Sequence, residues 1–179
     1  MQAPNGEKPI AGTPSSRLRA LGIDLPIPPT PLGAYVEISE TGDLLFVSGI
    51  LPMVNRKLAI SGRVGSELSI VEGQEAARLS TLNVLAVTEH HLGTLDRLRR
   101  LIKLTVIIAA TEEFSEHASV ADGASNIFVQ IFGRKPGHTR VVFGVCSLPL
   151  SAPVIVDTIF EIEPANQSTV NQKPKKDRI

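Results

Sequence analysis

The stretch that decides the fold is KPGHTRVVFGVCSLPLSAPVIVDTIFEIE, residues 135–163. It contains two apolar runs, residues 139–146 and 154–162, that are rich in β-branched side chains and therefore predict two strands. Pro149 and Pro153 lie between the runs and favour a loop there, because proline lacks an amide hydrogen. The first run carries Arg140 and the second carries Asp157, charged residues that a buried strand would normally exclude.

Arg140 stands at the start of the first run. Because side chains alternate along a strand, the residues that share its face are Val142, Gly144 and Cys146. An arginine in this position either lays its apolar stem along the core with its head in water or presents its planar guanidinium to a carboxylate. The spacing favours the first interpretation and leaves the second open. His138 has the same parity and is expected to line the same region, although a lone histidine is more often structural.

Asp157 lies in the second run, on the face of Ile155 and Ile159. A carboxylate inside an apolar strand is costly unless it is paired or partly hydrated. Asp157 is therefore a candidate base or water-orienting group, and an ion pair across a subunit boundary explains it equally well. No cationic residue adjoins Cys146, so this cysteine is predicted to be a small core side chain and not a nucleophile.

Outward from this stretch, helix and strand signals alternate. Apolar residues at helical spacing predict helices over 71–92 and 116–132, each followed by a glycine. A nearly continuous apolar run between them predicts a strand that is buried on both faces. The predicted strands are residues 34–39, 44–49, 100–110, 139–146 and 154–162, with a hairpin turn at 41–43.

The element order β-β-α-β-α-β-β predicts an α+β fold with a mixed sheet of about five or six strands. Two helices cover only one face of such a sheet, so we expect self-association to cover the other face if it is apolar. Before the domain, residues 1–14 are predicted to be disordered, Ser15 or Ser16 to cap a helix over 17–23, and the proline-rich residues 24–33 to form an extended strap.

The chain has 179 residues, which suits one domain, and its 18 basic and 18 acidic residues cancel. This balance argues against nucleic acid or an anionic membrane surface as a partner. Cys146 is the single cysteine, which suits a reducing compartment, and no signal peptide or spanning segment is recognisable. We therefore expect a cytoplasmic protein. Motifs for metal ligands, phosphate loops and dinucleotides are missing from the sequence, so no metal and no cofactor are expected.

Several segments in order, among them GAYVEI, LLFVSGILP, EGQEAARLSTLNVLA and GHTRVVFGVCSLPLSAPVIVDTIFEI, resemble the Rid family. This family is also known as YjgF, the reactive-intermediate deaminases, and as endoribonuclease L-PSP. The resemblance implies a chorismate-mutase-like fold, assembled as a homotrimer whose sheets form a central barrel, with ligand sites between subunits. It divides the chain into a leading helix and strap (1–31), a Rid-like domain (32–163) and a flexible tail (164–179).

The resemblance also assigns residues. Arg140 in HTR would bind a substrate carboxylate, and Tyr35 in GAY with Ser48 and Gly49 in VSGILP would line the pocket. The deaminases of the family hydrolyse 2-imino acids to 2-oxo acids and ammonia, and a strand glutamate normally helps to hold the water. That position is Ile155 here, while Asp157 offers a carboxylate two residues on.

Three functions follow. The first is a Rid-type hydrolase that uses Arg140, and Asp157 if this residue replaces the missing glutamate. The second is a non-catalytic homotrimer that binds a small carboxylate-bearing ligand, since Ile155 cannot activate water. The third, an endoribonuclease, is disfavoured because the chain has a balanced charge, one tyrosine and no tryptophan for base stacking.

Overall fold

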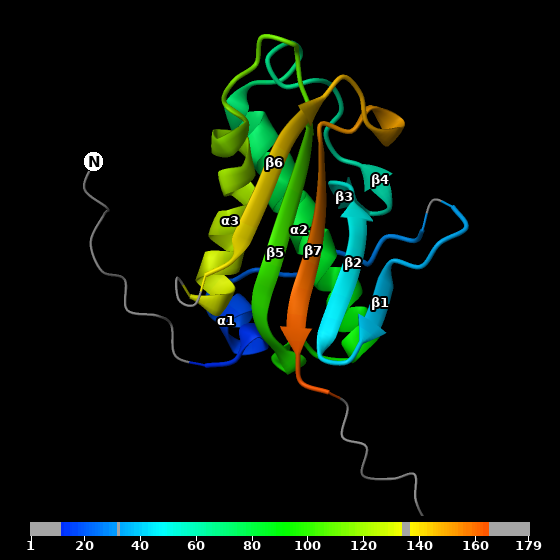
Figure 1. Ribbon diagram of the computed structural model, residues 1–179, viewed down its shortest axis with the longest axis vertical. Helices are drawn as coiled ribbons and strands as arrows, with labels where there is room; N and C mark the ends of the chain where they lie inside the picture. Colours follow the sequence, from blue (N-terminus) through cyan, green and yellow to red (C-terminus); the bar gives the residue numbers. More distant parts are fainter. Residues whose placement is uncertain (1–11, 32, 134–136, 165–179) are drawn as a thin grey trace, which may run out of the picture.

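The computed structural model describes residues 12–31, 33–133 and 137–164. Its centre is a five-stranded sheet with the strand order β1-β2-β7-β5-β6 (Figure 1). The pair β5–β6 is parallel and the other pairs of this sheet are antiparallel, so the sheet is mixed, as the element order predicted. In chain order its strands are β1 (Ile38–Thr41), β2 (Leu44–Ile50), β5 (Leu98–Ala109), β6 (Thr139–Val145) and β7 (Val154–Ile162).

Two long helices lie on one face of this sheet, behind it in Figure 1. Helix α2 (Ile70–Leu92) begins at a capping box between Ser69 and Glu72, in which each side chain accepts a hydrogen bond from the other residue's amide. It ends before Gly93, whose φ of 77° suits glycine. Helix α3 spans His117–Phe132. Both predicted helices are therefore confirmed to within one residue at each end.

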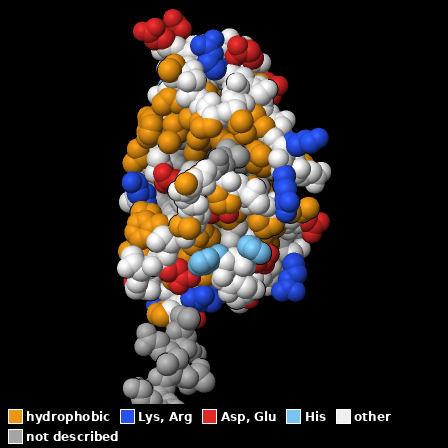
Figure 2. Space-filling view, turned by 90° about the vertical axis from the view of Figure 1, so that its right-hand side faces the viewer, with side chains coloured by type: hydrophobic (Ala, Val, Ile, Leu, Met, Phe, Trp, Pro, Cys, Tyr) orange, Lys and Arg blue, Asp and Glu red, His pale blue; other side chains and the backbone are white. Residues whose placement is uncertain are grey.

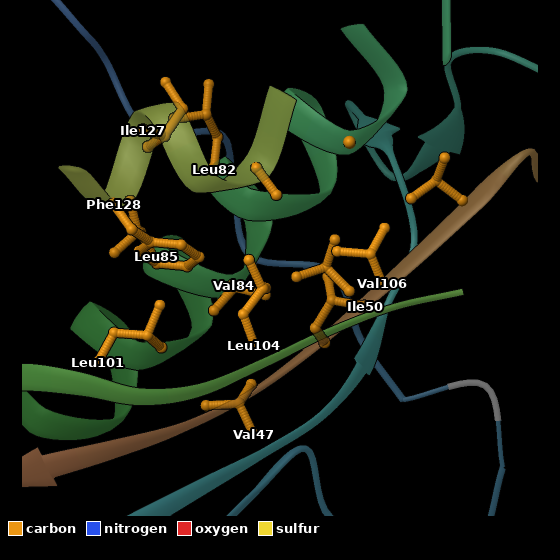
Figure 3. Close-up of a cluster of buried hydrophobic side chains, with 14 of the residues drawn as sticks. Val47, Ile50, Leu82, Val84, Leu85, Leu101, Leu104, Val106, Ile127 and Phe128 are labelled. Atoms are coloured by element: carbon orange, nitrogen blue, oxygen red, sulfur yellow. The ribbon is translucent and has the colours of Figure 1, made fainter. Parts of the chain in front are cut away.

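The hydrophobic core fills the space between the helices and the sheet (Figure 3). The two helices also contact each other closely at Gly123 of α3, where a Cβ atom would lie 2.1 Å from the carbonyl oxygen of Gln74 in α2. The side chains labelled in Figure 3 come from β2 (Val47, Ile50), α2 (Leu82, Val84, Leu85), β5 (Leu101, Leu104, Val106) and α3 (Ile127, Phe128).

No helix or strand among the described residues covers the opposite face of the sheet, which we call the open face (Figure 1). Phe46 of β2 and Val141 and Phe143 of β6 lie on it and are 39%, 46% and 44% exposed. The prediction that β5 is buried on both faces is wrong. Val106 is buried beneath the helices, whereas Ile107 is partly exposed because no described part of the chain covers its side of the strand.

The N-terminal helix begins earlier than predicted. Helix α1 (Pro14–Ala20) is capped by Thr13, not by Ser15 or Ser16: the Thr13 side chain accepts a hydrogen bond from the Ser16 amide, and Pro14 supplies the backbone angle that a first turn requires. The predicted disorder over 1–14 is thus wrong for Thr13 and Pro14, while residues 1–11 lie outside the described part. The expected flexibility of the tail falls on residues 165–179, also outside that part.

The strap and the first strand also differ in detail from the prediction. Residues 24–31 form no helix or strand, as expected, and Leu25 packs against the core. Strand β1 begins at Ile38, so residues 34–37 are irregular. The remaining elements are a small hairpin of β3 (Met53–Val54) and β4 (Lys57–Leu58) and the 3-10 helices η1 (Leu95–Arg97) and η2 (Pro149–Ser151).

The helices of the described residues are too short or too polar for a bilayer. None of them is both long and apolar enough to cross one.

Candidate functional site

Arg140 is the second residue of the edge strand β6, and its side chain points toward α3. Its Nη1 atom donates to Oδ1 of Asp122 at 2.7 Å and to Oγ of Ser125 at 3.0 Å. The Arg140 side chain is 25% exposed, so the guanidinium lies at the margin between strand and helix. The structure therefore places this arginine in an ion pair, with its polar head held by the neighbouring helix.

The predicted alternation along β6 is confirmed on this face. Val142 packs against the core, and Gly144 lies so close to His117 of α3 that a Cβ atom would be 2.3 Å from Nε2 of His117. Arg140, Val142 and Gly144 thus all face the helices. Cys146 follows the strand and is exposed, so its prediction as a core side chain is wrong: β6 ends at Val145, before the cysteine could be buried.

His138 shares a partner with Arg140. Nε2 of His138 lies 3.2 Å from Oγ of Ser125. Because arginine can only donate, Ser125 accepts from Arg140 and has its own proton available for Nε2 of His138. This pattern assigns the proton of the neutral ring to Nδ1. Burial, and then the positive charge of Arg140, lower the pKa of His138 from its usual value and so favour the neutral ring.

Asp157 lies on the open face, on the other side of the sheet from Arg140. Its neighbours Val156 and Thr158 are buried beneath the helices, and alternation turns Asp157 the opposite way. In the sheet it is opposite Thr105 of β5. The two residues predicted to be catalytic are therefore not brought together within one chain.

Ser48 and Gly49 lie in β2, next to the segment that carries Tyr35. The Ser48 amide donates to the carbonyl oxygen of Glu37 at 2.8 Å, which joins that segment to β2. Oγ of Ser48 is buried and has no hydrogen-bond partner among the described residues. A buried hydroxyl without a partner is unfavourable, so this oxygen suits a ligand or a neighbouring chain.

Hydrophobic side chains gather on this side of the molecule (Figure 2). Tyr35 and Val36, just before β1, are 47% and 70% exposed, and Val54 of the small hairpin is 42% exposed. An apolar surface of this kind is typical of a site that another surface covers.

Ile155 belongs to the group around Ser48 and Gly49. A Cβ atom on Gly49 would lie 2.6 Å from Cγ2 of Ile155, so only glycine permits this approach of β2 to β7. The position where the resemblance expects a glutamate thus adjoins Gly49 and not Arg140. Ile155 has no group that could accept a proton.

The predicted binding residues therefore form two groups toward opposite edges of the sheet, one at the edge strand β6 and the other at β2 and the segment before the edge strand β1. Arg140 and His138 belong to β6 and the loop before it, whereas Tyr35, Ser48 and Gly49 belong to β2 and the segment before β1. Strands β7 and β5 separate the two groups. Since neighbouring strands lie about 4.8 Å apart, β2 and β6 are roughly 14 Å apart across the sheet. A small ligand could contact both groups only if they came from different copies of the chain.

Sequence analysis did not identify Asp122 and Ser125. They are three residues apart on α3 and so lie on one face of the helix, but polar residues on a helix surface are ordinary. Only the packing of α3 beside β6 shows that they contact Arg140. In the parts of the chain that the structure describes, no group of three or more His, Cys, Asp or Glu side chains could hold a metal ion.

Comparison with known proteins gives the family. The sequence model described as "YjgF/chorismate mutase-like, putative endoribonuclease" matches residues 15–162. The chain belongs to this family. Protein TCP17 of Trypanosoma cruzi is 38% identical to this YjgF/Rid family member over 153 residues, which cover 85% of this chain and 96% of that protein.

Two solved structures are similar to this chain in both sequence and fold. A protein of unknown function from Agrobacterium tumefaciens is 39% identical, with a TM-score of 0.77 over 84% of this chain and 92% of that one. A "putative endoribonuclease" from Shewanella oneidensis is 33% identical, with a TM-score of 0.80 over 84% and 100%. The Escherichia coli protein TdcF, at 23% identity and a TM-score of 0.54, shares the fold over 76% of this chain and 94% of its own. The predicted α+β, chorismate-mutase-like fold is thus confirmed.

Proposed function

We propose that this Rid-family protein hydrolyses 2-imino acids to 2-oxo acids and ammonia, with Arg140 binding the substrate carboxylate. The proposal depends on how the guanidinium of Arg140 is bound. Residues of α3 hold it at the edge of the sheet, and they accept hydrogen bonds from its Nη1 atom alone. Its other nitrogens donate to no described residue, so they can bind a carboxylate from outside. A charge-assisted, two-point contact of this kind both anchors and orients a small substrate.

The proposal includes a homotrimer in which the open faces pack together around a central barrel. Two features support it. The open face carries exposed apolar side chains such as Phe46, Val141 and Phe143, which favour burial against another copy. In addition, the two groups of predicted site residues lie toward opposite edges of one sheet, so contact between edges of neighbouring copies would bring Arg140 near Ser48.

The reaction requires only a bound substrate and a water molecule placed beside its imine carbon. Water adds to the imine carbon, the C–N bond breaks, and nitrogen leaves as ammonia while the carbon becomes a carbonyl. Arg140 would hold the carboxylate beside this carbon, and the unpaired hydroxyl of Ser48 would line the pocket. Asp157 faces the open side of the sheet, so it could act on the substrate only across a subunit boundary.

The decisive experiment follows 2-oxo acid release while a dehydratase generates 2-aminoacrylate in the same solution. The wild-type protein should accelerate release, and Arg140→Ala should abolish the acceleration without changing the oligomeric mass measured by light scattering. Arg19→Ala, which removes an exposed arginine of α1, is the matched control and should act like wild type. Full activity of Arg140→Ala would refute the proposal.

The second candidate is a homotrimer that binds a small carboxylate without hydrolysing it. Ile155 favours this candidate, because it places an apolar side chain where a water-holding glutamate is expected. It predicts that pyruvate binds, that Arg140→Ala prevents binding, and that imine hydrolysis keeps its uncatalysed rate. RNA cleavage has less support, since the balanced charge offers no attraction for phosphates.

A further inference from the structure

We infer that Asp122 and Ser125 are positioning residues for Arg140, which present one edge of its guanidinium to the ligand and select a singly charged, planar carboxylate. This inference rests on the proposed binding of a carboxylate by Arg140. It adds two residues of α3, a binding geometry and a ligand charge to that proposal.

The geometry follows from the number of donors. A guanidinium has five N–H groups in one plane, two of them on Nη1. Asp122 and Ser125 accept hydrogen bonds from Nη1 at 2.7 and 3.0 Å, which uses that nitrogen's donors. The edge formed by Nε and Nη2 then remains, and its two N–H groups point the same way. Their spacing matches the two oxygens of a carboxylate, so the ligand should bind side-on along this edge.

The orientation of Arg140 depends on contacts that lead back to the hydrophobic core. Asp122 and Ser125 occupy one face of α3, and the residues between and beside them, Ala121 and Ala124, are fully buried. Ser125 is in turn held by Nε2 of His138. The ring of His138 meets the buried ring of Phe128 edge-on, with 6.4 Å between centroids. Of the two acceptors of Arg140, Ser125 is therefore restrained in its own position, whereas the Asp122 side chain is 54% exposed and has Arg140 as its partner.

The charges explain the preference for a single negative charge. Asp122 compensates the charge of Arg140, and the neutral form of His138 adds none. Arg100 lines a small cavity beside His138, and its charge is paired with Glu161. Among the described residues, the cluster of Arg140, Asp122 and His138 thus offers two parallel N–H donors to a carboxylate and carries no surplus positive charge. A phosphate dianion would need that surplus, whereas a monocarboxylate would not.

The test measures pyruvate binding by calorimetry on the full-length protein, at one pH and one low salt concentration. Asp122→Ala should weaken binding about three- to tenfold, because the Arg140 side chain would then lose conformational entropy when the ligand binds. Asp122→Asn should bind within about twofold of wild type, since the amide oxygen can accept the same hydrogen bond. Glu75→Gln breaks a comparable pair with Arg78 on α2 and should bind like wild type.

The outcomes separate this inference from the proposed function. If Arg140→Ala binds pyruvate like wild type, the proposed site itself is wrong. If Arg140→Ala loses binding while Asp122→Ala equals or exceeds wild type, only the positioning role is refuted, and Asp122 would instead compete with the ligand. Thermal unfolding of each variant checks that a loss of affinity does not come from misfolding.

Inorganic phosphate provides a second readout. The wild-type protein should bind phosphate at least about tenfold more weakly than pyruvate. Asp122→Asn should reduce this difference in affinity, because it leaves the positive charge of Arg140 uncompensated. Equal binding of phosphate and pyruvate by the wild type would overturn the predicted charge preference.

Discussion

Replacing Gly123 with alanine tests how closely the two long helices pack. The new methyl group would lie 2.1 Å from the carbonyl oxygen and 2.8 Å from the carbonyl carbon of Gln74. An ordinary contact begins at 3.4 Å, so the helices must separate by about 1.3 Å. Overpacking of this kind costs about 3 kcal/mol, at the upper end of its usual range, and the better helix propensity of alanine returns about 1 kcal/mol. We therefore expect a net loss of about 2 kcal/mol in the free energy of unfolding.

Gly73→Ala is the matched control, because it also adds a methyl group to a glycine inside one of the two long helices. That methyl group would meet only side-chain carbons of Val64 and Val120, at 3.1–3.2 Å, and these can yield by a few tenths of an ångström. Its stability should stay within about 1 kcal/mol of wild type. Urea unfolding at one fixed protein concentration measures both. With a slope of about 2 kcal/mol/M, Gly123→Ala should lower the midpoint by about 1 M. A midpoint equal to or above that of Gly73→Ala would refute the close approach of α2 and α3.

Two further predictions concern pH and catalysis. Folding lowers the pKa of His138 from its usual value of 6.5, so the unfolded chain binds a proton at this histidine more readily than the folded chain does. The free energy of unfolding should therefore fall as the pH decreases through 6.5. His138→Gln should remove this contribution to the dependence of the unfolding free energy on pH. Urea titrations between about pH 5 and 7.5 measure this, and parallel curves for the two proteins would contradict it. Ile155→Glu places a carboxylate beside Gly49 and should raise imine hydrolysis about 100-fold, as positioned bases commonly do. An unchanged rate of 2-oxo acid release in an intact assembly would count against a water-holding role for this position.

Much of the fold could be predicted because local pattern and tertiary packing agree. In α2, Ala76, Leu82 and Leu85 recur at helical spacing and all are buried, and a glycine ends the helix. The small β3–β4 hairpin could not be predicted in this way. Its strands have two residues each, and its turn places Asn55 and Arg56 at positive φ, which arginine rarely adopts.

The candidate site was predictable only in part. The parity of Arg140 along β6 follows from alternation within one strand, and the structure confirms it. Whether Asp157 faces the same way depends on how β7 is placed in the sheet, which alternation within β7 does not specify. The partners Asp122 and Ser125 come from the packing of α3 against β6, and no local pattern contains that information.

The placement of the predicted binding residues toward opposite edges of the sheet has a genetic consequence. In a ring of identical subunits, each proposed site would take Arg140 from one copy and Ser48 from the next. Two alleles that are each inactive, one defective at Arg140 and the other at Ser48, would then complement each other when expressed together. Random mixing would restore about a quarter of the sites, namely those where an intact Arg140 meets an intact Ser48. Two defects at the same edge would restore none.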